Sequence, residues 1–169
     1  MKRVLSSILL VLLLTSVVYS QSAPEVTLKK NSFGVGLGIP YGVLGANVDL
    51  NIAPNLNFSA GLGTTVVAGL GYCAGIKFFF APLKKTFRPR IGAFYGTNTA
   101  IEYIGSSEDN KSFAGLNIGL GAQWMWGRAK VNGMDFDIIY IATTGLDPEE
   151  EGVEDPGKIK ISVGFRHAF

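Results

Sequence analysis

The sequence predicts an all-β fold, namely an eight-stranded antiparallel up-and-down transmembrane β-barrel. Eight stretches alternate apolar residues with small or charged ones at a period of two, and turn residues separate the stretches. Glycine supplies 22 of the 169 residues and gathers on one side of the alternation. A strand with one apolar and one polar face suits a wall between lipid and a narrow polar lumen.

The N-terminus has the features of a secretory signal, which we predict over residues 1–20. Lys2 and Arg3 precede an apolar stretch from Val4 to Val18, and a small residue, Ser20, closes the cleavage box. The stretch is shorter than the roughly 20 residues of a spanning helix, so we expect cleavage rather than anchoring. Residues 21–31 would then form a short periplasmic leader, and residues 32–169 the barrel.

Composition and charge exclude several function classes. Without Lys2 and Arg3 the chain has 13 basic and 13 acidic residues, so it lacks the basic character of a nucleic-acid-binding protein. No apolar run after the signal is long enough for a transmembrane helix. Cys73 is the only cysteine and cannot form an internal disulfide, so we predict a small interior residue.

The strands follow in order along the chain, each bounded by turn signals. The predicted strands are 32–39, 44–52, 56–63, 70–80, 87–97, 114–126, 134–143 and 158–169. In each strand, one set of alternate residues contains no glycine and no Asp, Glu, Lys or Arg. We predict that this set faces outward, and that it includes Thr97 in the fifth strand and His167 in the eighth.

The opposite face of the strands holds fourteen glycines and the charged residues. The interior of an eight-stranded barrel is only just wide enough for side chains, so long charged side chains need small neighbours there. Buried charges are tolerated when they are paired and hydrogen-bonded. We therefore predict a charge network in the lumen, made of Asp49, Lys77, Arg88, Arg90, Asp135, Asp137, Lys160 and Arg166.

The lengths of the connections are consistent with an even number of strands. With the N-terminus in the periplasm, the periplasmic turns are 53–55, 81–86 and 127–133, and the external loops are 40–43, 64–69, 98–113 and 144–157. The two longest connections are then external, and both chain ends are periplasmic, as in bacterial outer-membrane barrels. Aromatic residues gather near both ends of the strands, which is typical of the two membrane interfaces.

The last strand, KIKISVGFRHAF, ends the chain on Phe169. Together with the signal and the eight alternating strands, it resembles the small eight-stranded outer-membrane barrels of the OmpX-like and OmpA-barrel-like group over residues 32–169. The resemblance implies a place in the cell outer membrane, in contact with outer-membrane lipid. It also implies an insertion signal for the barrel-assembly machinery, made of Ile161, Val163, Phe165 and Phe169. His167 departs from the family pattern, whose third-last residue is more often hydrophobic.

The candidates for catalysis are few. His167 is the only histidine, and it is predicted on the outer face near the periplasmic end, away from an external lipid substrate. Asp135 and Asp137 share the inward face about 7 Å apart and could act as acid and base, but the charge network is the favoured interpretation. The GLGYCA stretch from Gly69 fits a loose dinucleotide pattern without the helix that should follow it. We predict no enzyme activity, no catalytic residue, no cofactor and no metal site.

The favoured function is that of a non-enzymatic outer-membrane barrel with a plugged lumen, serving envelope structure or surface interaction. The loops 98–113 and 144–157 are polar and could bind a surface ligand. Loop 144–157 has six acids; a solvated loop, a cation site and contact with cationic material all remain open for it. Two alternatives are a narrow pore and a soluble lipocalin-like barrel with its faces inverted.

Overall fold

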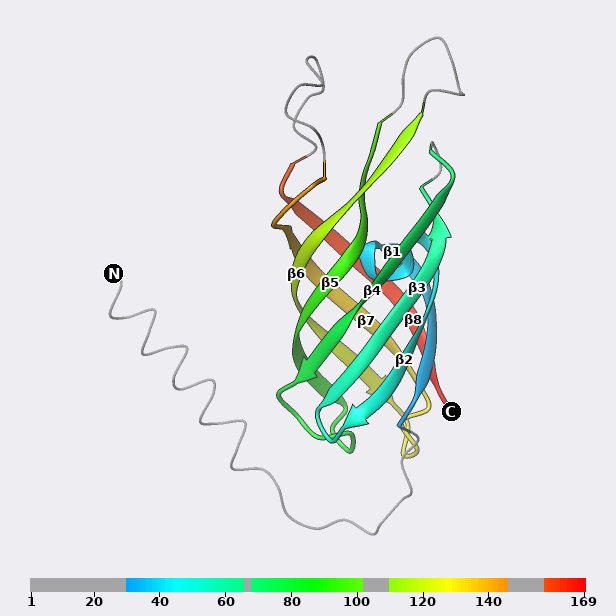
Figure 1. The fold of residues 1–169 in the computed structure, drawn as a ribbon. Coiled ribbons are helices and arrows are strands. Elements are labelled where there is room, and N and C mark those ends of the chain that lie inside the picture. Colours follow the sequence, from blue (N-terminus) through cyan, green and yellow to red (C-terminus); the bar gives the residue numbers. More distant parts are fainter. Residues whose placement is uncertain (1–29, 66–67, 102–109, 146–156) are drawn as a thin grey trace, which may run out of the picture.

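The computed structural model describes residues 30–65, 68–101, 110–145 and 157–169. These residues form a closed barrel in which eight antiparallel strands pair in chain order (Figure 1). The strands are β1 (Ser32–Gly38), β2 (Val43–Ala53), β3 (Leu56–Thr64), β4 (Leu70–Phe79), β5 (Phe87–Ile101), β6 (Lys111–Trp126), β7 (Asn132–Ile141) and β8 (Ile159–Ala168). The predicted fold class, an eight-stranded up-and-down barrel, is confirmed.

The barrel closes between its first and last strands. Their register extends from Ser32 opposite Ala168 to Leu37 opposite Val163. Beyond this ladder, the Phe169 N–H donates to the Asn31 carbonyl at 2.9 Å. The described N-terminal segment and the C-terminus therefore lie at the same end of the barrel, which we call the chain end; the opposite end is the loop end.

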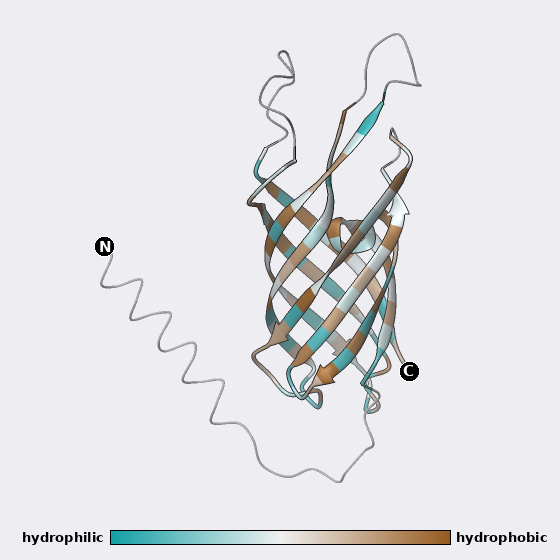
Figure 2. Ribbon diagram, viewed as in Figure 1, coloured by the Kyte–Doolittle hydropathy of each residue, from teal (hydrophilic) through white to brown (hydrophobic). Residues whose placement is uncertain are grey.

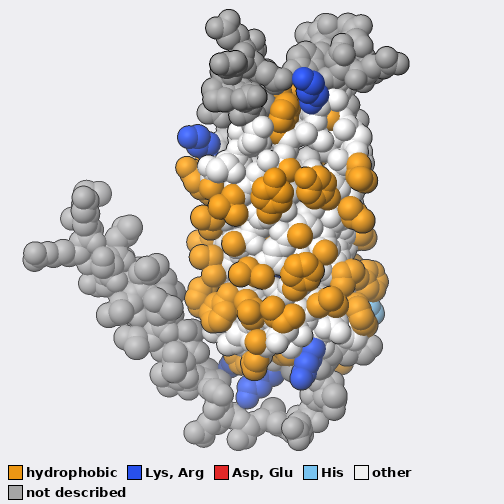
Figure 3. Space-filling model, in the orientation of Figure 1, with side chains coloured by type: hydrophobic (Ala, Val, Ile, Leu, Met, Phe, Trp, Pro, Cys, Tyr) orange, Lys and Arg blue, Asp and Glu red, His pale blue; other side chains and the backbone are white. Residues whose placement is uncertain are grey.

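The outer face of the barrel is apolar because the alternation along each strand is unbroken over most of its length. Leu62, Leu120 and Ile138 are each more than 60% exposed, although they lie within strands. Figure 2 shows the alternation as hydrophobic and hydrophilic bands across the strands. In the space-filling view of Figure 3, hydrophobic side chains form a broad belt, and Lys and Arg lie only beyond its two edges.

The hairpin of β5 and β6 is longer than predicted. The β5–β6 ladder continues to Ile101 opposite Lys111, past a register shift between Thr97 and Thr99. The prediction that 98–113 is wholly an external loop is therefore wrong: residues 98–101 and 111–113 extend the hairpin. The register shift has the character of a β-bulge, which a period-two pattern does not reveal.

The prediction for Thr97, which lies at the same irregularity, is also wrong. We predicted an outward-facing side chain, but Thr97 is buried. The β4–β5 ladder ends at Cys73 opposite Gly96, and the next N–H on β4, that of Tyr72, donates to Thr97 Oγ1 at 3.3 Å. The hydroxyl thus continues the hydrogen bonding of the strand where the backbone ladder stops.

The predicted external loop 40–43 is also wrong. A single turn of 3₁₀ helix, η1 (Ile39–Tyr41), folds into the barrel, and all three of its residues are buried. Figure 1 shows this turn inside the ring of strands. Gly38 and Gly42 flank η1 with φ values of 112° and 65°, which glycine adopts without strain. Val43, at φ 79°, begins β2 and does not share that freedom.

Several predictions concern residues outside the described ranges. The signal (1–20) and nearly all of the leader (21–31) are among them, as are most of the external part of 98–113 and nearly all of the acidic loop 144–157. Within the described ranges, no helix has both the length and the apolar character needed to cross a membrane.

Candidate functional site

The lumen contains a chain of ion pairs that begins on β4. Lys77 Nζ lies 2.9 Å from Asp49 Oδ1 on β2, and Arg166 Nη1 on β8 lies 2.9 Å from Asp49 Oδ2. All three side chains are fully buried. These residues lie toward the chain end of their strands, so three strands bring them to one level of the barrel.

The ion pairs continue through β7 and β5. Arg166 lies 2.6 Å from Asp135 Oδ2, and Arg90 lies 2.7 Å from Asp137 Oδ2. Arg90 Nη1 is also 3.1 Å from Asp135 Oδ1, without hydrogen-bond geometry. The complete order is Lys77, Asp49, Arg166, Asp135, Arg90 and Asp137, so the pairs form one continuous network across the lumen.

Arg88 is buried beside this network but is held differently. Its Nη1 donates to Gln123 Oε1 at 2.8 Å, and its Nε donates to the Ala81 carbonyl at 3.3 Å. The guanidinium carbon lies 3.8 Å from the centre of the Phe79 ring, a cation–π contact. Its Nη2 has no partner. The Arg88 guanidinium is therefore held by stacking on the Phe79 ring and by hydrogen bonds to uncharged acceptors.

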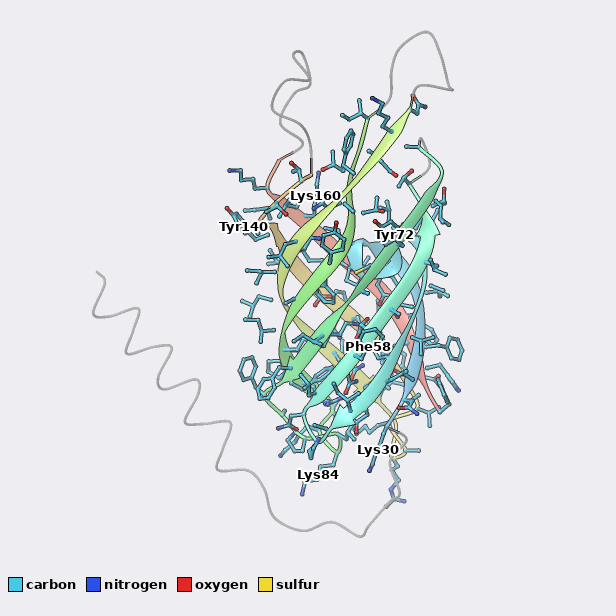
Figure 4. All side chains as sticks on the ribbon, in the orientation of Figure 1. Lys30, Phe58, Tyr72, Lys84, Tyr140 and Lys160 are labelled. Carbon is cyan, nitrogen blue, oxygen red and sulfur yellow. The ribbon has the colours of Figure 1, made fainter. Side chains whose placement is uncertain are left out.

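Lys160 takes no part in the ion pairs described above. It is half-buried. Figure 4 shows it at the loop end of β8. Its place on the inward face agrees with the alternation, but the network lies near the other end of the strand. The odd or even position of a residue along its strand indicates which face it occupies. Its position along the barrel axis depends on the register between the strands.

η1 covers the network from the loop-end side. The Tyr41 hydroxyl lies 3.3 Å from Asp135 Oδ2, where it can donate to the carboxylate. A Cβ added at Gly164 would overlap the Tyr41 ring, and one at Gly36 would lie 3.0 Å from it. The Pro40 carbonyl lies against Gly61 in the same way. Glycines on β1, β3 and β8 therefore make room for a backbone turn as well as for charged side chains.

Apolar side chains fill the lumen around and beyond η1. They form a buried cluster made of Ile39, Cys73, Phe94, Ile139 and Ile141. A Cβ at Gly75 or Gly92 would collide with the Phe94 ring, so these glycines make room for it. Cys73 is buried, as predicted. Phe94 and Ile139 were not singled out from the sequence, although both fall on the glycine face of their strands.

Two cavities lie at opposite mouths of the lumen. The one at the loop end, beyond η1, has a volume of about 310 Å³ and borders Ile39, Asn98 and Thr99. The one at the chain end measures only about 20 Å³ and borders Arg88 and Gln123. The described lumen between them holds the ion pairs, Tyr41 and the apolar cluster.

In the part of the chain that the structure describes, the titratable residues considered for catalysis lie apart from one another or are paired with arginine. His167 lies on the outer side of β8, where its Nδ1 is 2.8 Å from Asn132 Oδ1 and its ring is 5.4 Å from that of Phe33. Asp135 and Asp137 are each paired with arginine. Among the described residues, no cluster of three or more His, Cys, Asp or Glu side chains could hold a metal ion.

The residues of the predicted insertion signal share the outer face of β8. Ile161, Phe165 and Phe169 are exposed, and Val163 is half-buried. The Phe165 ring lies 6.2 Å from that of Trp126, and the Phe169 ring lies 6.4 Å from that of Phe33. The four side chains thus form one apolar edge, joined by aromatic contacts to Phe33 on the neighbouring strand β1 and, across β7, to Trp126 on β6.

Comparison with known proteins finds a likeness of fold. The crystal structure of the N-terminal β-barrel domain of Pseudomonas aeruginosa OprF superposes with a TM-score of 0.53 and 15% sequence identity. The alignment covers 83% of this chain and 98% of that one. No family model matches the sequence, and no curated protein matches it. At this level of identity the likeness shows the fold alone.

Proposed function

We propose that this chain is an integral outer-membrane barrel with a closed lumen, and that it serves the cell envelope without enzymatic activity. The observation that carries the proposal is the separation of polarity in the described residues. All three carboxylates, Asp49, Asp135 and Asp137, are inside the lumen, while the belt of large hydrophobic side chains is outside. Such a surface is costly in water and stable in lipid.

The separation of polarity also weighs against a soluble lipocalin-like barrel. That alternative needs an apolar interior and a polar exterior, and the described barrel has the opposite arrangement. Two neighbouring tryptophans on the outer face, Trp124 and Trp126, fit a membrane interface better than an aqueous surface.

Fractionation and gel mobility test the membrane placement. We expect the protein in the outer-membrane fraction, with a faster-migrating band when it is left unheated in SDS. Purification as a soluble periplasmic protein without detergent would contradict the proposal. Mass spectrometry of the mature protein would test the proposed cleavage after residue 20 and the leader over 21–31.

Single-channel recording tests the closed lumen. We expect no conductance steps in planar bilayers, because the ion pairs and η1 occupy the described lumen. The variants Arg90→Gln and Asp137→Asn are compared with the wild type. Steps in the wild type that change with either variant would favour the narrow pore.

The role of the outer loops is tested from the cell surface. We propose that surface interaction takes place through the loops between β5 and β6 and between β7 and β8. Protease applied to intact cells should cut only within 102–110 and 144–157. Cuts in the turns 81–86 or 127–133 would reverse the proposed orientation.

The proposed insertion signal is tested by comparing two exposed phenylalanines. Phe169→Ala should lower the amount of barrel assembled in cells, because the assembly machinery would recognise the aromatic edge of β8. Phe87→Ala, a matched change on the outer face of β5, should have a smaller effect. Equal losses would mean that Phe169 matters only as a lipid-facing side chain.

A further inference from the structure

The mouth of the lumen at the chain end contains a small cavity inside the ring of strands. Its volume of about 20 Å³ is enough for one water-sized group. Its described lining comes from β1, β3, β5, β6 and β8, from the turns after β4 and β6, and from the segment before β1. The strand residues in this lining are all buried, and their strands lie on all sides of the ring. The cavity therefore lies within the mouth, away from the lipid-facing wall.

The described lining of this cavity is positively charged. It includes Lys30, Arg88 and Lys130, and it includes no Asp or Glu. Lys30 is exposed, and Lys130 is half-buried with its Nζ donating to the uncharged Thr86 Oγ1 at 2.6 Å. Arg88 is buried against uncharged groups, as described above, so it contributes charge rather than an accessible contact. An anion that enters the mouth therefore meets three cations.

The turns around the cavity add to this positive charge. They carry Lys84, Lys85 and Arg128. Figure 4 shows Lys30 and Lys84 beyond the strands at this end. No Asp or Glu occurs in the described segments here, which are 30–31, 54–55, 80–86 and 127–131. The carboxyl terminus of Phe169 lies at the same end, outside the described lining of the cavity. A cleft surrounded by one sign of charge attracts counter-ions.

The side-chain oxygens of the described lining already serve as acceptors within the protein. Those that accept a hydrogen bond are Asn31 Oδ1, Ser32 Oγ, Asn57 Oδ1 and Gln123 Oε1. The donors to these atoms belong to Asn51, Arg88 and Arg166. With these oxygens in use, the lining side chains offer donors and positive charge, which suit an anion with several acceptor oxygens.

We propose that the chain-end mouth binds the phosphate group of a water-borne anion. One oxygen of the group enters the cavity, and the other oxygens meet Lys30 and Lys130 at its opening. A phosphate fits better than a carboxylate, because it carries up to two negative charges and at least three acceptor oxygens. The proposal rests on the membrane placement and orientation above for its compartment, since this mouth then opens to the periplasm.

Methionine methyl groups report on this cavity. After residue 20 the sequence has only Met125 and Met134. Met125 lines the cavity and is 4% exposed, whereas Met134 lies opposite the exposed Trp124 on the outer face. The test uses the mature protein with ¹³C-labelled methionine methyl groups in phosphatidylcholine nanodiscs. Inorganic phosphate replaces sodium chloride at constant ionic strength. We expect a saturable shift at Met125 and none at Met134.

Matched lysine variants separate a defined site from general attraction by charge. Lys30→Gln and Lys130→Gln should each weaken phosphate binding about threefold, which is within the range for one exposed ion pair. Lys158→Gln removes the same charge from an exposed position at the loop end and should leave phosphate binding unchanged. Acetate, with a single charge, should bind more weakly than phosphate.

Three results would overturn the proposal. One is the absence of a saturable Met125 shift in protein that is inserted and heat-modifiable, which leaves the proposed function intact. Another is an equal loss of binding in Lys158→Gln, which would mean that net charge alone attracts phosphate. The third is a Met125 shift caused by phosphatidylglycerol in the nanodisc without added phosphate, which would assign the site to a lipid head group. Failure of the protein to insert at all would instead contradict the proposed function.

Discussion

At the scale of single residues, glycine in the lumen is matched to particular neighbours. Gly164 faces the Tyr41 side chain, Gly61 faces the Pro40 carbonyl, and Gly121 lies against the Asp137 carboxylate. Close packing leaves no space for an added methyl group at such positions. The glycines therefore determine where the turn η1 and the charged side chains can lie.

Gly164→Ala should destabilise the barrel by about 1–3 kcal/mol through overpacking against Tyr41. Tyr41→Ala alone should cost about 3–5 kcal/mol, because it leaves a large cavity. The double variant should lose clearly less than the sum, since the small residue at position 41 removes the overlap. Urea unfolding of the refolded protein in lipid vesicles measures all three free energies.

A milder glycine substitution serves as the control. Gly119→Ala places its Cβ 3.2 Å from the Phe94 ring and should cost less than Gly164→Ala. Additivity of the Gly164 and Tyr41 changes would show that the two residues are not in contact.

The ion pairs give a second prediction at this scale. Asp135 pairs with both Arg166 and Arg90, so Asp135→Asn leaves buried positive charge uncompensated and should cost about 3–5 kcal/mol. Arg88→Gln should cost less, because Arg88 contacts the uncharged groups of Gln123, Ala81 and the Phe79 ring. The same unfolding assay compares them, and a larger loss for Arg88→Gln would contradict the assigned pairing.

At the scale of the elements, hairpins of unequal length shape the loop end. β1 has 7 residues and β2 has 11, whereas β5 has 15 and β6 has 16. The short β1–β2 hairpin allows η1 to fold inward, and pairing of β1 with β8 ends at Leu37 opposite Val163, although β8 begins at Ile159. The long β5–β6 hairpin contributes Asn98 and Thr99 to the cavity at the loop end. At the chain end, by contrast, short turns join the described strands.

Two tryptophans at the chain end of β6 test how deeply the barrel lies in the bilayer. Trp124 and Trp126 are exposed on the outer face, with their ring centres 6.5 Å apart. Because tryptophan rings favour the membrane interface, lipids brominated near the head group should quench their fluorescence more than lipids brominated at the chain terminus. Stronger quenching by the deeper label would mean that the belt is placed wrongly in the bilayer.

At the scale of the whole molecule, the distribution of polar and apolar side chains is the reverse of that in a soluble protein. The charged network occupies the interior, and the large hydrophobic residues occupy the exterior, where Figure 3 shows them as a belt. Closure of β1 onto β8 removes the free sheet edges, which satisfies the backbone hydrogen bonds that lipid cannot. The arrangement agrees with the fold shared with the OprF barrel domain.

Replacing an outer-belt residue with arginine tests whether the belt faces lipid or water. Leu120→Arg, at an exposed position within β6, should cost about 2–4 kcal/mol of unfolding free energy in bilayers. Ala129→Arg, at an exposed position in the turn after β6, should have almost no effect. Equal and small effects would show that Leu120 does not face lipid.

The sequence alone determined the strand count, the antiparallel closure and the two faces. It could do so because side chains alternate with a period of two and because charges such as Asp49 and Arg166 cannot face lipid. It also placed Asp135, Asp137 and Arg90 on one face, without determining which of the charged residues there are partners. Those partners depend on how neighbouring strands are staggered, and alternation carries no information about stagger.

Only the tertiary structure decided that a turn of the chain also enters the lumen and where the ladder between two strands is interrupted. The inward fold of residues 39–41 depends on space left by Gly36, Gly61 and Gly164, which lie on three different strands. The bulge at Thr97 depends on the end of the neighbouring β4 ladder. Both features arise from contacts between residues far apart in the chain. The alternation of residues along one strand predicts only whether each side chain faces inward or outward.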